Sequence, residues 1–162
     1  AWAINHHRRN LKDGQLKAIA KNGGVVFVNF YSGFLDSTYE NKNNEFLKLH
    51  KAELDSLTII AGDLDMAVIR LYGLYPTEGN SFRPPLSSLI NNIDYIVKLI
   101  GVDHVGIGAD FDGAESFPLQ MNDVSCYPLI AGELKKIGYT DSDIMKIASE
   151  NFIRVLKANE KN

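Results

Sequence analysis

The chain has 162 residues, of which 45% are hydrophobic and 23% charged, and its formal net charge is −3. This length allows a sizeable core, and the slightly acidic balance argues against general nucleic-acid binding, which needs a basic face. No run of about 18 apolar residues suggests a membrane span, and the single Cys126 excludes an internal disulfide. Because the chain starts without Met, we expect a cleaved, truncated or partial product.

The first predicted elements are a loop, a helix and a strand. Residues 1–10 have the composition of a loop, aromatic and then basic, and Asn10 with Asp13 suggests a capping box for the helix that follows. Gly23-Gly24 ends this helix. The continuous apolar run Val25–Phe30 is typical of a strand buried on both faces, as in a parallel sheet covered by helices.

The middle of the chain is predicted to be mainly helical. Within residues 36–75, the apolar residues from Phe46 to Leu64 fit one or two helices with charged outer faces, and the more apolar stretch Met66–Tyr75 is also expected to be helical. Residues 76–85 have the composition of a loop. A clear amphipathic helix follows and ends at Gly101. Its apolar residues recur at helical spacing: Leu89, Ile93, Ile96, Val97 and Ile100.

The stretch Val105–Gly113 is the most informative part of the sequence. Alternate residues from Gly106 to Asp110 give a strand with one nearly bare face and a carboxylate at its C-terminal end. In parallel α/β folds, chemistry takes place at the C-terminal ends of strands. Asp110 is therefore the first candidate functional residue, and the alternative is a turn carboxylate that caps the next loop.

The last third of the chain is predicted to contain two helices. After an irregular stretch, Ser125 is expected to cap a short helix with Pro128 in its first turn, which Gly138 ends. Thr140 with Asp143 opens the final helix. These elements and the two strands predict a parallel pair, yet two apolar strands alone would leave long unpaired edges. We therefore expect the chain to be part of a larger barrel or sheet.

Five ordered blocks carry a family resemblance, and they are Arg8–Asp13, Gly23–Tyr31, Val105–Gly113, Asp123–Pro128 and Asn151–Val155. Together they closely resemble the C-terminal part of the membrane (renal-type) dipeptidases, a family of metallopeptidases. The resemblance covers essentially the whole chain and is loosest at residues 36–85.

The resemblance implies an α/β fold, namely the C-terminal portion of a (β/α)8 TIM barrel of the amidohydrolase type. Residues 1–162 would supply its last two βα units and its C-terminal helices, and the N-terminal portion of the domain would be missing. The family holds two zinc ions, and its ligands lie upstream of the first block, so we expect no metal ligand in this chain. The implied activity is zinc-dependent dipeptide hydrolysis by the full-length enzyme, and the isolated chain should be inactive.

Two site residues follow from the resemblance. Arg9 matches the arginine that contacts the substrate carboxylate, a role that suits a planar guanidinium with paired donors. Asp110 matches the aspartate at the end of the eighth strand, where a carboxylate can take a proton from zinc-activated water and pass it to the leaving amine.

Other residues receive less specific expectations. His6 and His7 are adjacent and so point in different directions, which favours a structural or solvent role over a metal site. Phe34 and Gly113 follow the strands and are expected to line the pocket. Asn151 is expected to bond to backbone rather than to substrate.

Several alternatives stay open at this stage. The alternatives for the complete protein are a related amidohydrolase-type metal hydrolase of another amide or lactam, and a metal-less non-catalytic homologue. The expected partners are a dipeptide substrate, the N-terminal portion of the same enzyme and, in a homodimer, a second copy. The sequence is compatible with a periplasmic, a membrane-anchored or a cytoplasmic location.

Overall fold

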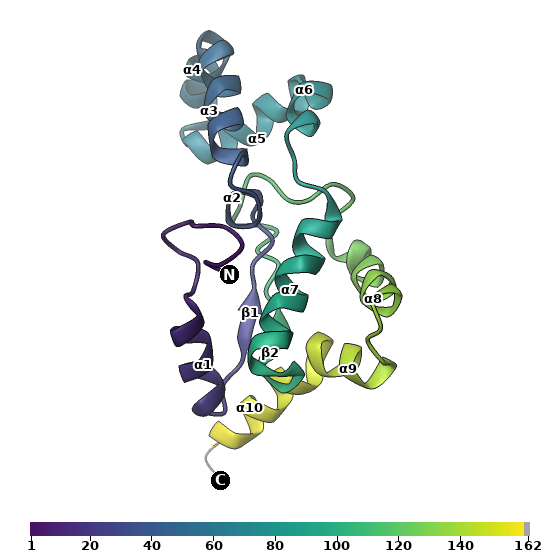
Figure 1. Ribbon diagram of the computed structural model, residues 1–162. Helices are drawn as coiled ribbons and strands as arrows, with labels where there is room; N and C mark the ends of the chain where they lie inside the picture. Colours follow the sequence, from purple (N-terminus) through teal and green to yellow (C-terminus); the bar gives the residue numbers. More distant parts are fainter. Residues whose placement is uncertain (161–162) are drawn as a thin grey trace.

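The computed structural model describes residues 1–160 and is mostly helical, with two short parallel strands (Figure 1). Its first half contains α1 (Asp13–Lys21), β1 (Val26–Val28), α2 (Ser32–Leu35), α3 (Tyr39–Leu49), α4 (Lys51–Ala61), α5 (Leu64–Leu74) and α6 (Pro76–Ser81). Its second half contains α7 (Leu86–Ile100), η1 (Val102–His104), β2 (Val105–Ile107), η2 (Val124–Cys126), α8 (Tyr127–Lys136), α9 (Asp141–Met145), the π-helical η3 (Lys146–Glu150) and α10 (Asn151–Asn159).

The two strands form the predicted parallel pair, with Val26 opposite Val105 and Phe27 opposite Gly106. Each strand has only three residues, fewer than the apolar runs suggested. Val26, Val28 and Val105 are buried on one face of the pair, but Phe27 on the other face is 45% exposed. The expectation of a strand buried on both faces is therefore wrong at Phe27, because residues 1–160 cover that face only in part, through contacts such as Phe27 with Phe152.

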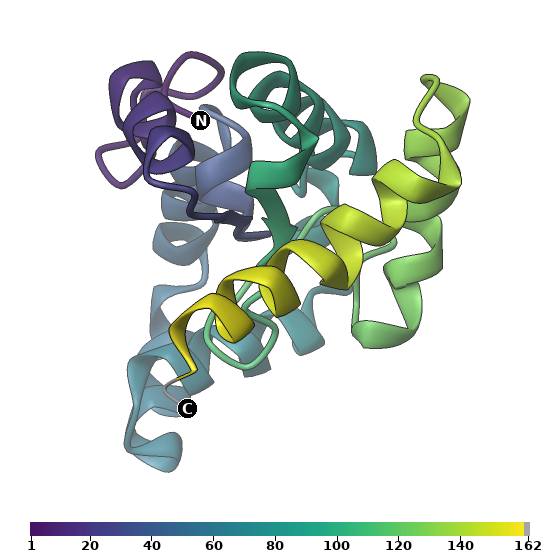
Figure 2. The same cartoon turned by 90° about the horizontal axis from the view of Figure 1, so that it is seen from below.

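The main core lies between the strands and the helices packed beside them. Helix α7 contacts α1, α8 and β2, and the segment η3–α10 lies against β2 at the lower end of the pair (Figure 2). Fully buried side chains from four elements meet here, including Leu16, Leu89, Ile93, Val105, Ile130 and Leu134. Burying these apolar surfaces is the main driving force for this arrangement.

Helices α3 to α6 form a lobe of their own at the top of Figure 1. Its core consists of Tyr39, Phe46, Leu71 and Phe82. The prediction of a loop over residues 76–85 is wrong at its start, because Pro76 opens the six-residue helix α6. Proline suits a first helical turn, since its φ is already helical and its missing N–H has no intrahelical partner there.

Helix starts were predicted with mixed success. Thr140 and Asp143 form the expected capping box of α9. The N-cap of α1 is Lys12 rather than Asn10, and the Lys12 N–H donates to Gln15 Oε1 at 2.9 Å. Before α8, the side chain of Asp123 rather than that of Ser125 caps the turn, accepting the Ser125 N–H at 2.8 Å. Within residues 1–160, no helix is long and apolar enough to cross a membrane.

Candidate functional site

The C-terminal ends of the two strands bring an amide and a carboxylate together. Asn29 follows β1 and Asp110 follows β2, and Asn29 Nδ2 donates a hydrogen bond to Asp110 Oδ2 at 2.8 Å. The other end of the same amide is also fixed, because the Tyr31 backbone N–H donates to Asn29 Oδ1 at 2.7 Å. The parallel pairing of the strands thus places these two side chains side by side.

The backbone at the end of β2 has an unusual conformation. Ala109 has a φ of 23° and Asp110 a φ of 81°, in the region that favours glycine. Such residues cost about 1–3 kcal/mol each and persist where surrounding contacts determine them. Here the Phe30 N–H donates to the Ala109 carbonyl at 3.0 Å, and the Gly113 N–H donates to the Asp110 carbonyl at 3.1 Å.

Arg9 belongs to the loop that precedes α1. Its guanidinium carbon lies 5.1 Å from the centre of the Phe34 ring, within the range of a cation–π contact. Asn10 fastens this loop to α2, since its Nδ2 donates to the carbonyls of Asn5 and Phe34 at 3.0 and 2.9 Å. The loop is therefore held against the segment that follows β1.

Arg9 and Asp110 line one cleft of about 250 Å³. Both side chains are exposed to it. The expected lining residues Phe34 and Gly113 are there too, and the whole set is His7, Arg8, Arg9, Tyr31, Phe34, Asp110, Gly113, Ala114 and Glu115. The cleft thus contains a permanent positive charge and a carboxylate, an arrangement that can hold a small molecule with charges of both signs.

Tyr31 supplies an uncharged polar group to this cleft. Burial and the neighbouring Glu115 carboxylate raise the pKa of its phenol. Tyr31 therefore keeps its proton at neutral pH and can both donate and accept hydrogen bonds there.

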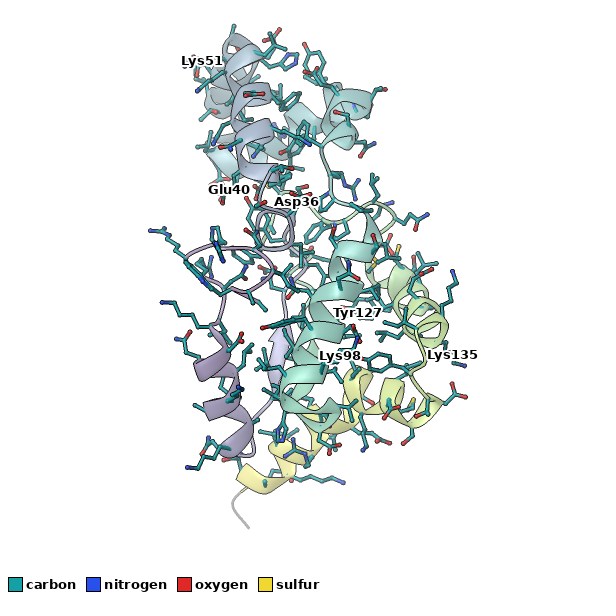
Figure 3. All side chains as sticks on the ribbon, viewed as in Figure 1. Asp36, Glu40, Lys51, Lys98, Tyr127 and Lys135 are labelled. Carbon is teal, nitrogen blue, oxygen red and sulfur yellow. The ribbon has the colours of Figure 1, made fainter. Side chains whose placement is uncertain are left out.

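The histidines near the N-terminus make contacts within the protein. His7 Nε2 lies 3.1 Å from Glu40 Oε1, and Glu40 stands at the start of α3 in Figure 3. The His6 ring stacks on Trp2 with centroids 5.0 Å apart. Among residues 1–160, no group of three or more His, Cys, Asp or Glu side chains is placed to hold a metal ion.

The sequence matches the model of one protein family along its whole length. Residues 1–162 match the membrane dipeptidase family, also described as peptidase family M19. The chain belongs to this family. The resemblance inferred from the five sequence blocks is thus confirmed.

Individual proteins are similar to the chain over most of its residues. A protein from the pqqA 5′ region of Klebsiella pneumoniae is 31% identical over 157 residues, which are 97% of this chain and 43% of that protein. An uncharacterized dipeptidase of Schizosaccharomyces pombe is 28% identical over 99% of this chain and 29% of its own length. The chain therefore spans less than half the length of these two relatives.

Solved structures share the fold. A protein of Pseudomonas aeruginosa described as the probable dipeptidase PvdM superposes with a TM-score of 0.65 at 27% identity, covering 94% of this chain and 41% of that protein. A metallopeptidase of Rhodobacter sphaeroides, crystallised with a phosphinate mimic of L-Ala-D-Ala, gives a TM-score of 0.65 at 24% identity, covering 96% and 33%. The two-stranded chain thus matches part of a larger fold.

Sequence reasoning missed three polar residues of the cleft region: Asn29, Tyr31 and Glu115. Asn29 did carry a usable signal, because it is the only polar residue in the apolar run Val25–Phe30. By strand alternation it also shares the face of Phe27, and the pairing of the strands makes this the same face as that of Gly106 and Gly108. Glu115 offered no comparable pattern, since it lies in an irregular loop.

Proposed function

We propose that the complete protein is a zinc-dependent dipeptidase to which this chain contributes Arg9 and Asp110. In this proposal residues 1–162 form the C-terminal segment of one (β/α)8 barrel domain, with β1 and β2 as its seventh and eighth strands. The open face of the strand pair and the partial coverage of the M19 relatives support this reading. Two strands of an eight-stranded barrel need neighbouring strands to complete the sheet.

In this proposal the zinc ligands lie in the part of the enzyme outside this chain. Residues 1–160 contain no group of three or more His, Cys, Asp or Glu side chains placed to hold a metal ion. A bound zinc pair would supply an activated water and polarise the scissile carbonyl. This chain itself would supply the side chains of Arg9 and Asp110.

The shared cleft of Arg9 and Asp110 is the observation that carries the proposal. The Arg9 guanidinium can hold the C-terminal carboxylate of a dipeptide through two parallel hydrogen bonds. The Asp110 carboxylate can accept a proton and release it to the leaving amine. Support for a dipeptide as substrate comes from the Rhodobacter sphaeroides relative, whose ligand mimics L-Ala-D-Ala.

The role of Arg9 is tested by its replacement in the complete enzyme. Arg9→Ala should lower kcat/KM for dipeptides about 10- to 100-fold, because a charge-assisted hydrogen bond contributes about 1.5–3 kcal/mol. Dipeptides with an amidated C-terminus should lose little, since they lack the carboxylate. Lys17→Ala on the exposed side of α1 is the control for loss of one positive charge. Equal losses on both substrate types would contradict the role.

The role of Asp110 is tested by Asp110→Asn, which keeps the shape and removes the proton acceptor. We expect kcat to fall about 10²- to 10⁴-fold, the usual contribution of general acid–base catalysis, with zinc content unchanged. An unchanged kcat would refute the assignment.

The other readings of the sequence make different predictions. A panel of dipeptides, other amides and lactams separates a dipeptidase from a related amidohydrolase. A complete protein that binds no zinc and hydrolyses none of these compounds would instead be a non-catalytic homologue. Association with a second copy stays a prediction, which analytical ultracentrifugation of the complete protein can check.

A further inference from the structure

We propose that Asn29 is a positioning residue that fixes the Asp110 carboxylate for proton transfer. This inference rests on the proposed function, because it assigns Asn29 a role that acts through Asp110. Its physical basis is the hydrogen bond of 2.8 Å between Asn29 Nδ2 and Asp110 Oδ2.

The orientation of the Asn29 amide is determined by its surroundings. The Tyr31 backbone N–H can only donate, and it lies 2.7 Å from Asn29 Oδ1. A flipped amide would point its NH₂ group at that N–H and its oxygen at the Asp110 carboxylate, giving two repulsive contacts in place of two hydrogen bonds. Asn29 therefore acts only as a donor toward Asp110.

This contact distinguishes the two oxygens of the carboxylate. Asp110 Oδ2 accepts the hydrogen bond from Asn29, so Oδ1 is the carboxylate oxygen that Asn29 does not bind. Oδ1 lies so close to Gly113 that a Cβ at that position would overlap it. Asn29 thus holds one oxygen of the carboxylate through a hydrogen bond, and the other oxygen lies in the space that a side chain at position 113 would occupy.

An exposed carboxylate needs such support if it is to transfer protons. Asp110 lies on the surface of the cleft, where an unsupported side chain would sample several rotamers. A displacement of about 1 Å from the productive geometry can cost 10²-fold in rate. The segment that carries Asn29 is itself anchored, because the Ser32 N–H donates to the Ser116 carbonyl at 3.0 Å.

The decisive variant is Asn29→Asp in the complete enzyme. It keeps an oxygen for the Tyr31 N–H, but it replaces the donor toward Asp110 with a second carboxylate of nearly the same shape. We expect kcat for a dipeptide to fall about 10- to 100-fold, with KM within about twofold and with unchanged zinc content. The control is Asn91→Asp on the exposed side of α7, which makes the same chemical change away from the cleft and should leave kcat unchanged.

A double-mutant cycle separates positioning from a general structural effect. In an Asp110→Asn background, Asn29→Asp should cause no further loss of kcat, because the group it positions no longer transfers protons. A loss of the same size in both backgrounds would overturn the inference, since Asn29 would then act independently of Asp110.

The leaving group provides a second readout that a purely structural defect would not move. A depsipeptide substrate, with an ester in place of the amide, depends less on protonation of its leaving group. Asn29→Asp should therefore slow the depsipeptide less than the matching dipeptide, and equal losses would overturn the inference. If Asp110→Asn lowers kcat but Asn29→Asp does not, only this inference fails, whereas an unaffected Asp110→Asn enzyme would refute the proposed function as well.

Discussion

The ring of Phe27 lies against Gly106, the residue directly opposite it in the parallel pair. A Cβ on Gly106 would come within 2.7 and 2.8 Å of two ring carbons of Phe27. Gly108 is also close to Phe27, but there a Cβ would meet the Phe27 Cβ at 3.0 Å and its carbonyl carbon at 3.1 Å. Gly106 thus leaves space for the Phe27 ring, whereas Gly108 leaves space for the Cβ and backbone of Phe27 in β1.

This difference predicts which substitution can be rescued. Gly106→Ala and Gly108→Ala should each destabilise the complete protein by about 1–3 kcal/mol, the usual cost of overpacking. In a Phe27→Ala background the cost of Gly106→Ala should largely disappear, because the obstructing ring is gone. The cost of Gly108→Ala should remain, since Phe27→Ala keeps the Cβ and the backbone. Denaturant unfolding of the single and double variants measures both couplings, and rescue of both glycine variants would contradict the packing described here.

The same region shows what the sequence could and could not predict. Alternation of Gly106, Gly108 and Asp110 was enough to predict a bare strand face with a carboxylate at its end. The ring that fills the bare face was not predictable, because Phe27 is 79 positions away in the chain and only the pairing register brings it opposite Gly106. Residues paired across strands depend on tertiary structure, which local patterns do not specify.

The candidate site follows the same division. Asp110 was predicted from the strand pattern and the family resemblance, and Arg9 from the resemblance alone. Their meeting in one cleft depends on how the loop before α1 packs on α2. Helix boundaries were least predictable where several polar residues compete. Lys12 is the N-cap of α1 because the Asn10 amide is used to hold the loop. The local sequence does not show that Asn10 makes this contact.

Asn151, in the C-terminal helix α10, is predicted to contribute strongly to the stability of the protein. Its Nδ2 donates to the carbonyls of Val102 at 2.7 Å and Val105 at 2.8 Å, and the side chain is 3% exposed. This confirms that Asn151 bonds to backbone. Asn151→Ala should lower the free energy of unfolding by about 2–4 kcal/mol, because two carbonyls lose their donor.

A matched control for Asn151 lies on the same helix. Asn159 Nδ2 donates to the Val155 carbonyl at 2.8 Å, but in an exposed position. Asn159→Ala should change the free energy of unfolding by less than about 0.5 kcal/mol. Chemical denaturation of both variants tests the pair, and equal effects would argue against the role of burial at Asn151.

The capping box at Thr140 gives a stability that depends on pH. Hydrogen bonds from the Thr140 hydroxyl and backbone N–H, at 2.6 and 3.0 Å, lower the pKa of Asp143. A carboxyl whose folded pKa lies below its unfolded value stabilises the protein above that unfolded value, about 3.9 for Asp, and the stabilisation is lost as the pH falls through the folded pKa. Asp143→Ala should therefore lower the melting temperature at pH 7 and have a shrinking effect below about pH 4.

Thermal melts between pH 7 and pH 3 check this prediction. Thr140→Ser keeps a hydroxyl cap and should behave like the unaltered protein at every pH. A melting-temperature difference for Asp143→Ala that stays constant across the range would show that the negative charge of Asp143 has no part in the cap.

Replacing Gly113 is predicted to lower the activity and to leave the free energy of unfolding nearly unchanged. A Cβ at this exposed position would overlap Asp110 Oδ1, so Gly113→Ala must displace the carboxylate or the turn that follows it. Under the proposed function kcat for dipeptides should fall about 10- to 100-fold. Because the displaced group is exposed, the free energy of unfolding should change by less than about 1 kcal/mol.

Gly132 in α8 is the matched control, since a Cβ there would meet no heavy atom within 4 Å. Gly132→Ala should preserve kcat and stabilise the helix by up to about 1 kcal/mol, because alanine loses less backbone entropy than glycine. Steady-state kinetics and denaturant unfolding of the two variants measure both quantities. If Gly113→Ala kept full kcat, the carboxylate of Asp110 would have to work equally well from a different position, and the geometric basis of its assignment would be lost.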